Sequence, residues 1–246
     1  MRAYLLLACS LITLATPCAE ASFQLTFRSN YGGTATVVDN GVRDEDPMVG
    51  SIRVGGVGGT PLVLNGYTFR THMAYAGQAG GINFISTGTL VTGWGAGSIS
   101  ILASMNDIST SQPQGMVSSN AAISFVTPLK VCNTATVEYG AYVDNLNRLS
   151  TQPQGTLVSA PASGYIDGNA STAAASVASF SDDTVVASNS LFAMNLYLRA
   201  TGLMANVGNR LFFDGGLQFL PIPESSSGVI WSLLGGLALA WRRRCC

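Results

Sequence analysis

The sequence predicts an all-β protein, an antiparallel β-sandwich of jelly-roll-like type, and three observations support this prediction. Short runs with a hydrophobic residue at every second position recur along residues 22–220, as expected for half-buried strands. Glycine-rich connections separate these runs, and the chain contains 28 glycines among its 246 residues. No long stretch has the periodicity of an amphipathic helix, although the Ala-, Ser- and Thr-rich stretch 170–178 is ambiguous.

The expected strands can be placed in order along the chain from this alternation. They cover residues 23–27, 35–37, 52–54, 61–64, 67–73, 81–85, 98–105, 123–126, 136–143, 191–203 and 211–220. Tight turns are expected where small or turn-forming residues interrupt the pattern, at Gly32-Gly33, Asn40-Gly41, Asn65-Gly66 and Asp214-Gly215-Gly216. No charged or Pro-rich linker divides residues 22–220, so the sequence predicts a single domain.

A short motif occurs twice in this domain. Gln112-Pro113-Gln114-Gly115 recurs forty residues later as the segment 152–155, each time after a hydrophobic run. Two copies are too few for a solenoid, and glycine after this pattern suits a turn. The repeat predicts two similar hairpin corners in one sandwich.

Composition excludes several classes of function. The net charge is −1, with only 10% charged residues, so no basic patch is expected for nucleic acid. His72 is the single histidine and Lys130 the single lysine, which leaves few general bases and no imidazole cluster. Cys132 is the only cysteine between residues 22 and 220, so neither an intrachain disulfide nor a zinc site is expected there. We expect no cofactor.

The N-terminus has the features of a secretory signal peptide covering residues 1–21. Met1-Arg2 provides a positive start, an apolar stretch follows, and Ala19 and Ala21 form a small-x-small cleavage site. A membrane span is the alternative, but the apolar run is too short for one. A lipoprotein signal fits less well, because Pro17 precedes Cys18.

The C-terminal segment 221–246 predicts a membrane anchor. Three serines, 225–227, lead into an apolar run that covers residues 228–241. Together they make 17 residues, or about 25 Å of helix, which is just enough to cross a bilayer. Arg242, Arg243 and Arg244 follow and are expected to stay cytoplasmic and stop translocation.

This tail resembles the PEP-CTERM sorting signal of exported bacterial proteins, in which a Pro-Glu-Pro motif precedes a short helix and an arginine cluster. Pro223 and Glu224 match the first two motif positions, and Ser225 stands in place of the second proline. The resemblance implies processing by exosortase, a membrane-embedded cysteine transpeptidase, and delivery to the envelope or extracellular matrix. An ordinary tail anchor is the alternative.

The segment 38–52 carries a second resemblance. Asp39-Asn40-Gly41, followed by Asp44-Glu45-Asp46-Pro47 and a Gly50-led strand, is similar to an opening common in exported β proteins with PEP-CTERM tails. It implies a secreted β-sandwich without an assigned biochemical role.

The domain offers few candidates for chemistry. His72 lies on an expected strand, with no Gly-x-Ser-x-Gly elbow to partner it. Asp44, Glu45 and Asp46 could offer carboxylates to calcium, but they lack EF-hand spacing, and a solvated turn is the default. Asp182-Asp183 has the same two interpretations. The glycine-rich segment 55–59 opens no helix, so it predicts a loop and not a phosphate site.

Two rival functions remain open beside a structural or interaction role. Trp94 is flanked by glycines and could stack on a sugar from an exposed loop, with Tyr75 or Tyr142 in the same strip; otherwise Trp94 belongs to the core. Asp144 and Asp167 could serve a glycosidase if their carboxyl groups lay about 5–10 Å apart in one cleft.

We therefore expect an exported, non-enzymatic structural or interaction protein that passes through the membrane as an anchored precursor and ends at the cell surface or outside it. Its expected partners are the export machinery, signal peptidase and, by resemblance, an exosortase-like enzyme, with exopolysaccharide as a further candidate. A carbohydrate-binding module is the first alternative, and a glycan-acting hydrolase is the second.

Overall fold

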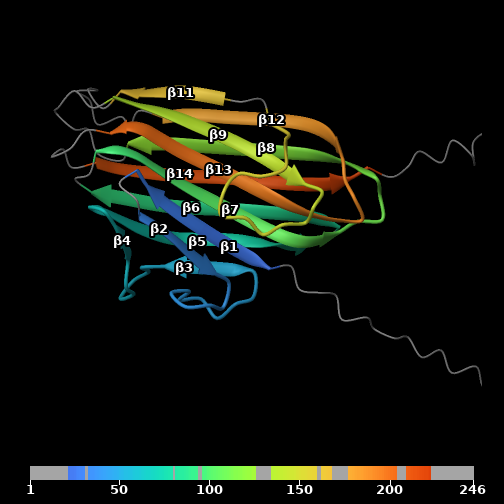
Figure 1. The fold of residues 1–246 in the computed structure, drawn as a ribbon, viewed down its shortest axis with the longest axis horizontal. Helices are drawn as coiled ribbons and strands as arrows, with labels where there is room; N and C mark the ends of the chain where they lie inside the picture. Colours follow the sequence, from blue (N-terminus) through green and yellow to red (C-terminus); the bar gives the residue numbers. More distant parts are fainter. Residues whose placement is uncertain are drawn as a thin grey trace, which may run out of the picture.

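The protein is an antiparallel β-sandwich. The computed structural model describes residues 22–30, 33–79, 81–93, 96–125, 134–159, 162–167, 177–203 and 209–222. These residues form two antiparallel sheets without any helix (Figure 1), which confirms the predicted all-β class. The expected signal peptide, the expected C-terminal helix and Cys132 lie outside them. Within the described ranges, no helix has the length and apolar character needed to cross a membrane.

Each sheet has seven strands. Sheet A has the order β10 (Thr156–Leu157), β9 (Thr134–Asp144), β13 (Leu191–Leu203), β7 (Gly97–Ser109), β1 (Phe23–Ser29) and β2 (Gly33–Val38), and β11 (Ala162–Asp167) also pairs with β9. Sheet B has the order β12 (Val177–Ala187), β8 (Gln114–Phe125), β14 (Asn209–Pro221), β6 (Ile82–Gly93), β5 (Tyr67–Ala79) and β3 (Ser51–Val54), and β4 (Leu62–Leu64) also pairs with β5. The last two strands, β13 and β14, therefore occupy central places in sheets A and B.

The core lies between the two sheets and forms one cluster of buried side chains. Along β6 and β14, for example, alternate residues are buried in it, as the period-2 pattern of the sequence predicts. Aromatic pairs join the sheets: the rings of Phe27 and Phe69 are 5.3 Å apart, and those of Phe192 and Phe219 are 4.7 Å apart. These tilted contacts add to the stabilisation that burial of the rings provides.

Two of the turns expected from glycine can be checked in sheet B. The turn at Asn65-Gly66 is confirmed, and the turn at 214–216 is wrong. Asn65 and Gly66 join β4 to β5 with φ of 45° and 81°, the left-handed conformation that a tight hairpin needs. Asp214-Gly215-Gly216 instead lies in the middle of β14. A Cβ on Gly215 would stand 3.0 Å from Leu196 across the core, so this glycine allows close packing of the sheets.

The sequence did not predict β12, β11 or the first part of β8. Inward-facing positions of β8 include Val117, Ser119 and Ala121, which are small and partly polar, so hydrophobic alternation is weak. These residues are buried because β8 lies between β12 and β14 in sheet B, and this pairing cannot be seen in the local sequence pattern.

The two Gln-Pro-Gln-Gly copies are not similar hairpin corners. The first connects β7 of sheet A to β8 of sheet B, while the second lies in the long loop between β9 and β10. They share only a local turn: Thr110 Oγ1 accepts a hydrogen bond from the Gln112 amide, and Ser150 Oγ accepts one from the Gln152 amide.

Both ends of the described domain lie at the same end of the sandwich. Phe23 pairs with Met105 near the end of β7, and Pro221 pairs with Gly115 at the start of β8, just across the β7–β8 connection. The start of β1 and the arrowhead of β14 accordingly lie toward the right in Figure 1. Gly93 pairs with Tyr67 and Asn209 at the opposite end.

Candidate functional site

The outer face of sheet A is crossed by a loop, residues 145–155, which we call the strap (Figure 1, yellow loop over β13 and β7). Asn147 fastens it to β7, because its amide oxygen accepts from the Asp107 N–H and its Nδ2 donates to Asp107 Oδ1, both at 2.7 Å. Asn145 fastens it to Asn189, with the Asn189 amide donating to Asn145 Oδ1 at 2.9 Å. The strap is therefore an ordered part of this face.

An ion pair closes the start of the strap. Arg148 donates from Nε and Nη2 to the two carboxylate oxygens of Asp144, at 2.8 and 3.2 Å. Burial is the largest influence on the Asp144 carboxyl and raises its pKa, but the hydrogen bonds from Arg148 and the Leu146 amide together outweigh it. The pKa of Asp144 is therefore lowered, and the carboxylate stays charged beneath the strap.

The strap covers a row of polar side chains that point outward from sheet A. Gln24, Ser104 and Asn195 pair in register across β1, β7 and β13, and all are buried. The Ser150 amide donates to Ser104 Oγ, Gln24 Nε2 donates to the Ser150 carbonyl, and Asn195 Nδ2 donates to the Gln154 carbonyl. These bonds satisfy the backbone of a loop that would otherwise need water.

Beside the strap, two tyrosines remain partly exposed on the same face. Tyr197 pairs in register with Gly140, and a Cβ on Gly140 would lie 2.8 Å from a ring carbon of Tyr142. The missing side chain of Gly140 therefore gives the Tyr142 ring room to lie close to the sheet. Burial raises the pKa of the Tyr142 phenol, and the nearby Tyr197 and Glu138 raise it further.

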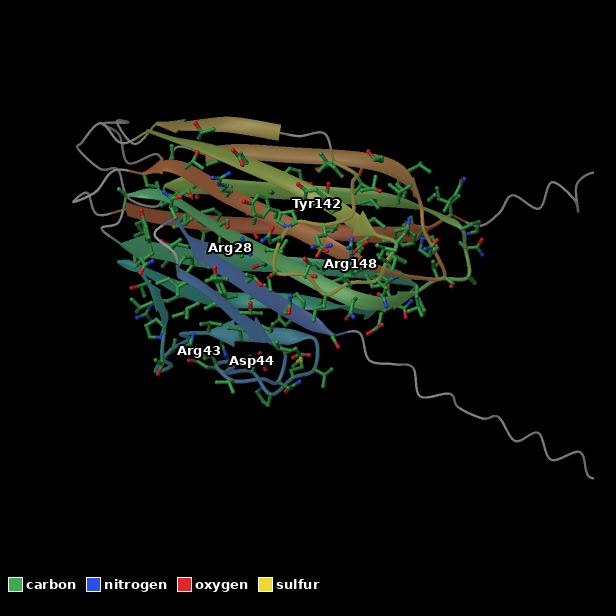
Figure 2. The ribbon with its side chains drawn as sticks, in the orientation of Figure 1. Arg28, Arg43, Asp44, Tyr142 and Arg148 are labelled. Carbon is green, nitrogen blue, oxygen red and sulfur yellow. The ribbon has the colours of Figure 1, made fainter. Side chains whose placement is uncertain are left out.

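Charged residues continue this face away from the strap. Arg199 of β13 donates from Nη1 to Glu138 Oε2 at 3.3 Å, and both side chains are about two-fifths exposed, at 37% and 41%. Arg28 of β1 lies in the same row and is half-buried. Figure 2 shows Arg28, Tyr142 and Arg148 over sheet A. We call Arg28, Glu138, Tyr142, Tyr197 and Arg199 the tyrosine–arginine patch.

The acidic segment proposed for calcium is a hydrogen-bonded loop. Asp44 accepts from the amides of Asn40, Asp46 and Arg53, at 2.8, 2.9 and 3.1 Å. Asp46 accepts from the Met48 amide and the Ser51 hydroxyl. Within the described ranges, no three His, Cys, Asp or Glu side chains are grouped to hold a metal ion.

Two carboxyls of this loop differ in pKa. Burial raises the pKa of Asp39 above its usual value, and the Asp44 charge adds to this, while the Gly50 amide opposes it. The Met48 amide and then the Ser51 hydroxyl lower the pKa of Asp46. Each shift follows from local hydrogen bonding and burial, which is the behaviour of a structural loop.

Glu45 organises the glycine-rich loop that follows β3. Its Oε2 accepts from the Gly56 amide at 2.8 Å and its Oε1 from the Thr60 amide at 2.7 Å. The carboxylate occupies the space where a Cβ of Gly59 would stand. The loop, with Glu45, Arg53 and His72, lines an open pocket of about 600 Å³. His72 is exposed at a bulge of β5, between the register positions of Thr71 and Met73.

We predict that Glu45→Gln loosens this loop without unfolding the domain. The glutamine side chain has one acceptor oxygen where the carboxylate has two, so one of the two amide bonds is lost. Amide hydrogen exchange at Gly56 or Thr60 should accelerate about tenfold, because losing one hydrogen bond lowers the free energy of local opening by about 1.4 kcal/mol. Exchange at Val91 in β6 serves as the control and should not change.

The structure separates the residues proposed for the rival functions. Asp167 pairs with Thr134 at the start of β9, whereas Asp144 is the last residue of that strand. Ten residues of strand span about 33 Å, far beyond the separation a glycosidase pair needs. Tyr75 and Tyr142 point outward from sheets B and A, so they share no strip. Trp94 and Asp182 side chains lie outside what the structure describes.

Of the residues in the tyrosine–arginine patch, Tyr142 could be named from the sequence, whereas Arg28, Tyr197 and Arg199 could not. Tyr197 and Arg199 stand at outward positions of the expected strand 191–203, whereas Arg28 falls one residue beyond the expected strand 23–27 and belongs to β1 only in the structure. What was lacking was the order of the strands, since β1 and β13 are neighbours of β7 only in the folded sheet.

Comparison with known proteins assigns no family. No protein-family model and no curated protein matches the chain. Among solved structures, the chain is similar to "Structure of infectious bursal disease virus Gx strain", with 10% identity, a TM-score of 0.31 and 81% of this chain covered. The match spans half the length of that viral chain. A second viral structure, "Crystal structure of infectious bursal disease virus VP2 subviral particle", has 11% identity, a TM-score of 0.16, and coverage of 94% and 70%. Similarity at these scores carries no argument about function.

Proposed function

We propose that this chain is an exported cell-surface or extracellular-matrix interaction protein whose tail is a PEP-CTERM-type sorting signal. The observation that supports the proposal is the position of the Pro-Glu-Ser motif directly after the β domain. Among the described residues, the last backbone hydrogen bond runs from the Ile222 amide to the Gln114 carbonyl, and Pro223-Glu224-Ser225 follows directly in the sequence. A processing enzyme would therefore meet its motif directly beyond a folded β domain.

The same proposal includes the topology and the export route. We assign the sandwich a jelly-roll-like topology; in support of this, β6, β7 and β8 alternate between the sheets, and β13 and β14 insert between earlier strands. The signal peptide ends at Ala21, one residue before the described domain. Signal peptidase and an exosortase-like enzyme act on the two ends, and Arg242, Arg243 and Arg244 hold the precursor in the membrane until processing.

The intact mass of the protein extracted from the cell surface tests this proposal. A product ending near Glu224 supports exosortase-like processing. A product that still carries the Arg-Arg-Arg-Cys-Cys end contradicts it and makes the tail a plain anchor.

We predict that Pro223→Ala combined with Glu224→Ala blocks maturation but leaves membrane insertion intact. Neither residue lies in the apolar run, so hydrophobic insertion should not depend on them. An enzyme would read both, since proline keeps the backbone extended and glutamate supplies one charge. The full-length form, including Trp241, should accumulate in the membrane fraction; normal processing of this variant would contradict the prediction.

Carbohydrate binding is the second candidate function, favoured by one observation. Tyr142 and Tyr197 lie side by side on an outer sheet face, next to charged hydrogen-bonding groups. Tyrosine combines an apolar ring face with a hydroxyl, which suits contact with a sugar.

A further inference from the structure

Two arginines flank a small residue on the outer face of sheet A. Arg28 of β1 and Arg199 of β13 both pair in register with Ser100 of β7, so the three form one row across the sheet. Two strand spacings separate the Cα atoms of the arginines by about 10 Å. Because the serine side chain is short, both guanidinium groups can approach the space above it.

The two arginines differ in how their charge is satisfied. Arg199 pairs with Glu138 on the side away from Ser100. Arg28 has no ion pair among the described residues, and its Nε is buried without a hydrogen-bond partner there. A buried charged donor without an acceptor costs free energy, and such groups commonly bind an ion or water. The described residues therefore offer Arg28 Nε no acceptor, and a ligand could supply one.

The charge of this face contrasts with that of the domain. Residues 22–220 contain eight basic and eleven acidic side chains, a net charge of −3. The strap face carries three arginines, Arg28, Arg148 and Arg199, and three carboxylates, Asp107, Glu138 and Asp144, so it is neutral where the domain is net negative. Among the three arginines of this face, Arg28 alone has no ion pair with a described residue, so the row around it favours an anion.

We propose that Arg28, Ser100 and Arg199 bind the carboxylate of an acidic polysaccharide, with a sugar ring against Tyr197 and Tyr142. The planar guanidinium matches a carboxylate with two parallel hydrogen bonds. Tyr197 lies one row from the arginines, about 7 Å along the strand, which is the scale of one sugar ring. This inference deepens the carbohydrate-binding candidate and does not depend on how the tail is processed.

Oligogalacturonate binding to the full chain, purified in detergent, tests the proposal by calorimetry. The matched ligand is the same oligomer with its carboxylates methyl-esterified. We expect Arg28→Gln to weaken oligogalacturonate binding at least about tenfold, the value of one charge-assisted hydrogen bond. Arg210→Gln is the control, since Arg210 is an exposed arginine on sheet B and its loss changes the net charge equally.

Each outcome is decisive for the site. Loss with Arg28→Gln but not with Arg210→Gln supports the proposal, as does Arg28→Lys with intermediate affinity and an unchanged unfolding midpoint. Equal weakening by both glutamine variants overturns it, because the attraction would then be non-specific. Equal binding of the esterified oligomer overturns the carboxylate site while leaving carbohydrate binding in place. Binding only to phosphatidylglycerol vesicles overturns it in favour of a lipid.

Discussion

Replacing Phe219 by alanine is expected to lower the free energy of unfolding by about 3–5 kcal/mol, the largest effect we predict. The Phe219 side chain is fully buried on the central strand β14, and its ring lies 4.7 Å from that of Phe192 in the other sheet. Removing it leaves a cavity between the two sheets. Urea unfolding followed by circular dichroism measures the loss.

A matched variant on the same strand separates burial from strand propensity. Phe212 points to the outer face of sheet B, where its ring lies 3.5 Å from the place of a Cβ on Gly88. Phe212→Ala is expected to cost only about 1 kcal/mol, because much of the ring already faces water. Equal losses for the two phenylalanines would contradict the core assignment.

Gly115 provides a second test of the same contact. A Cβ on this buried glycine would overlap the Phe219 ring, so Gly115→Ala should cost about 1–3 kcal/mol in the wild-type chain. In the Phe219→Ala background the space is empty, and the cost should fall close to zero. Additive losses would show that the two residues do not share this space.

Breaking the ion pair at the start of the strap is the second large effect we expect. Arg148→Ala leaves the Asp144 carboxylate, whose side chain is 3% exposed, without its two guanidinium bonds. Because Arg148 is itself 48% exposed, solvent moderates the loss, and we expect it to be smaller than the loss for Phe219→Ala. Amide exchange at Ser150, which bonds to Ser104 under the strap, should accelerate as well.

The pH dependence of this pair has a definite sign. The folded-state pKa of Asp144 is lowered, so its stabilisation is complete above the unfolded pKa of about 4 and is lost as pH falls through the folded value. The stability difference between wild type and Asp144→Asn should thus be constant from about pH 5 to 7 and shrink below about pH 4. A difference that grows in acid would contradict the lowered pKa.

The surface pair Arg199–Glu138 is the control for this prediction. Both of its side chains are exposed to a similar degree, and such pairs contribute about 0–1 kcal/mol. A loss for Arg199→Ala equal to that for Arg148→Ala would show that the strap adds nothing to the Asp144 pair.

Local sequence patterns were sufficient to predict the strand character of most of the sandwich. Phe23, Leu25 and Phe27 alternate with polar residues, and Asn65-Gly66 has the chemistry of a left-handed turn, so both are local properties of the chain. The same local reasoning failed at Asp214-Gly215-Gly216. Those glycines serve a close approach to Leu196 across the core, which depends on residues distant in sequence.

The candidate site, in contrast, depends on how distant strands pair in the folded sheets. Tyr142 could be named from the sequence, but its neighbours Tyr197 and Arg28 come from β13 and β1, which adjoin β9 and β7 through sheet order. The sequence allowed Asp144 and Asp167 to form a catalytic carboxylate pair. The strand register instead places Asp167 of β11 beside the first residue of β9, whereas Asp144 is the last residue of β9. Side-chain alternation is set within one strand by backbone geometry, whereas proximity across a sheet is set by pairing between strands far apart in the chain. That is why the sequence determined the strands and the folded sheets determined the site.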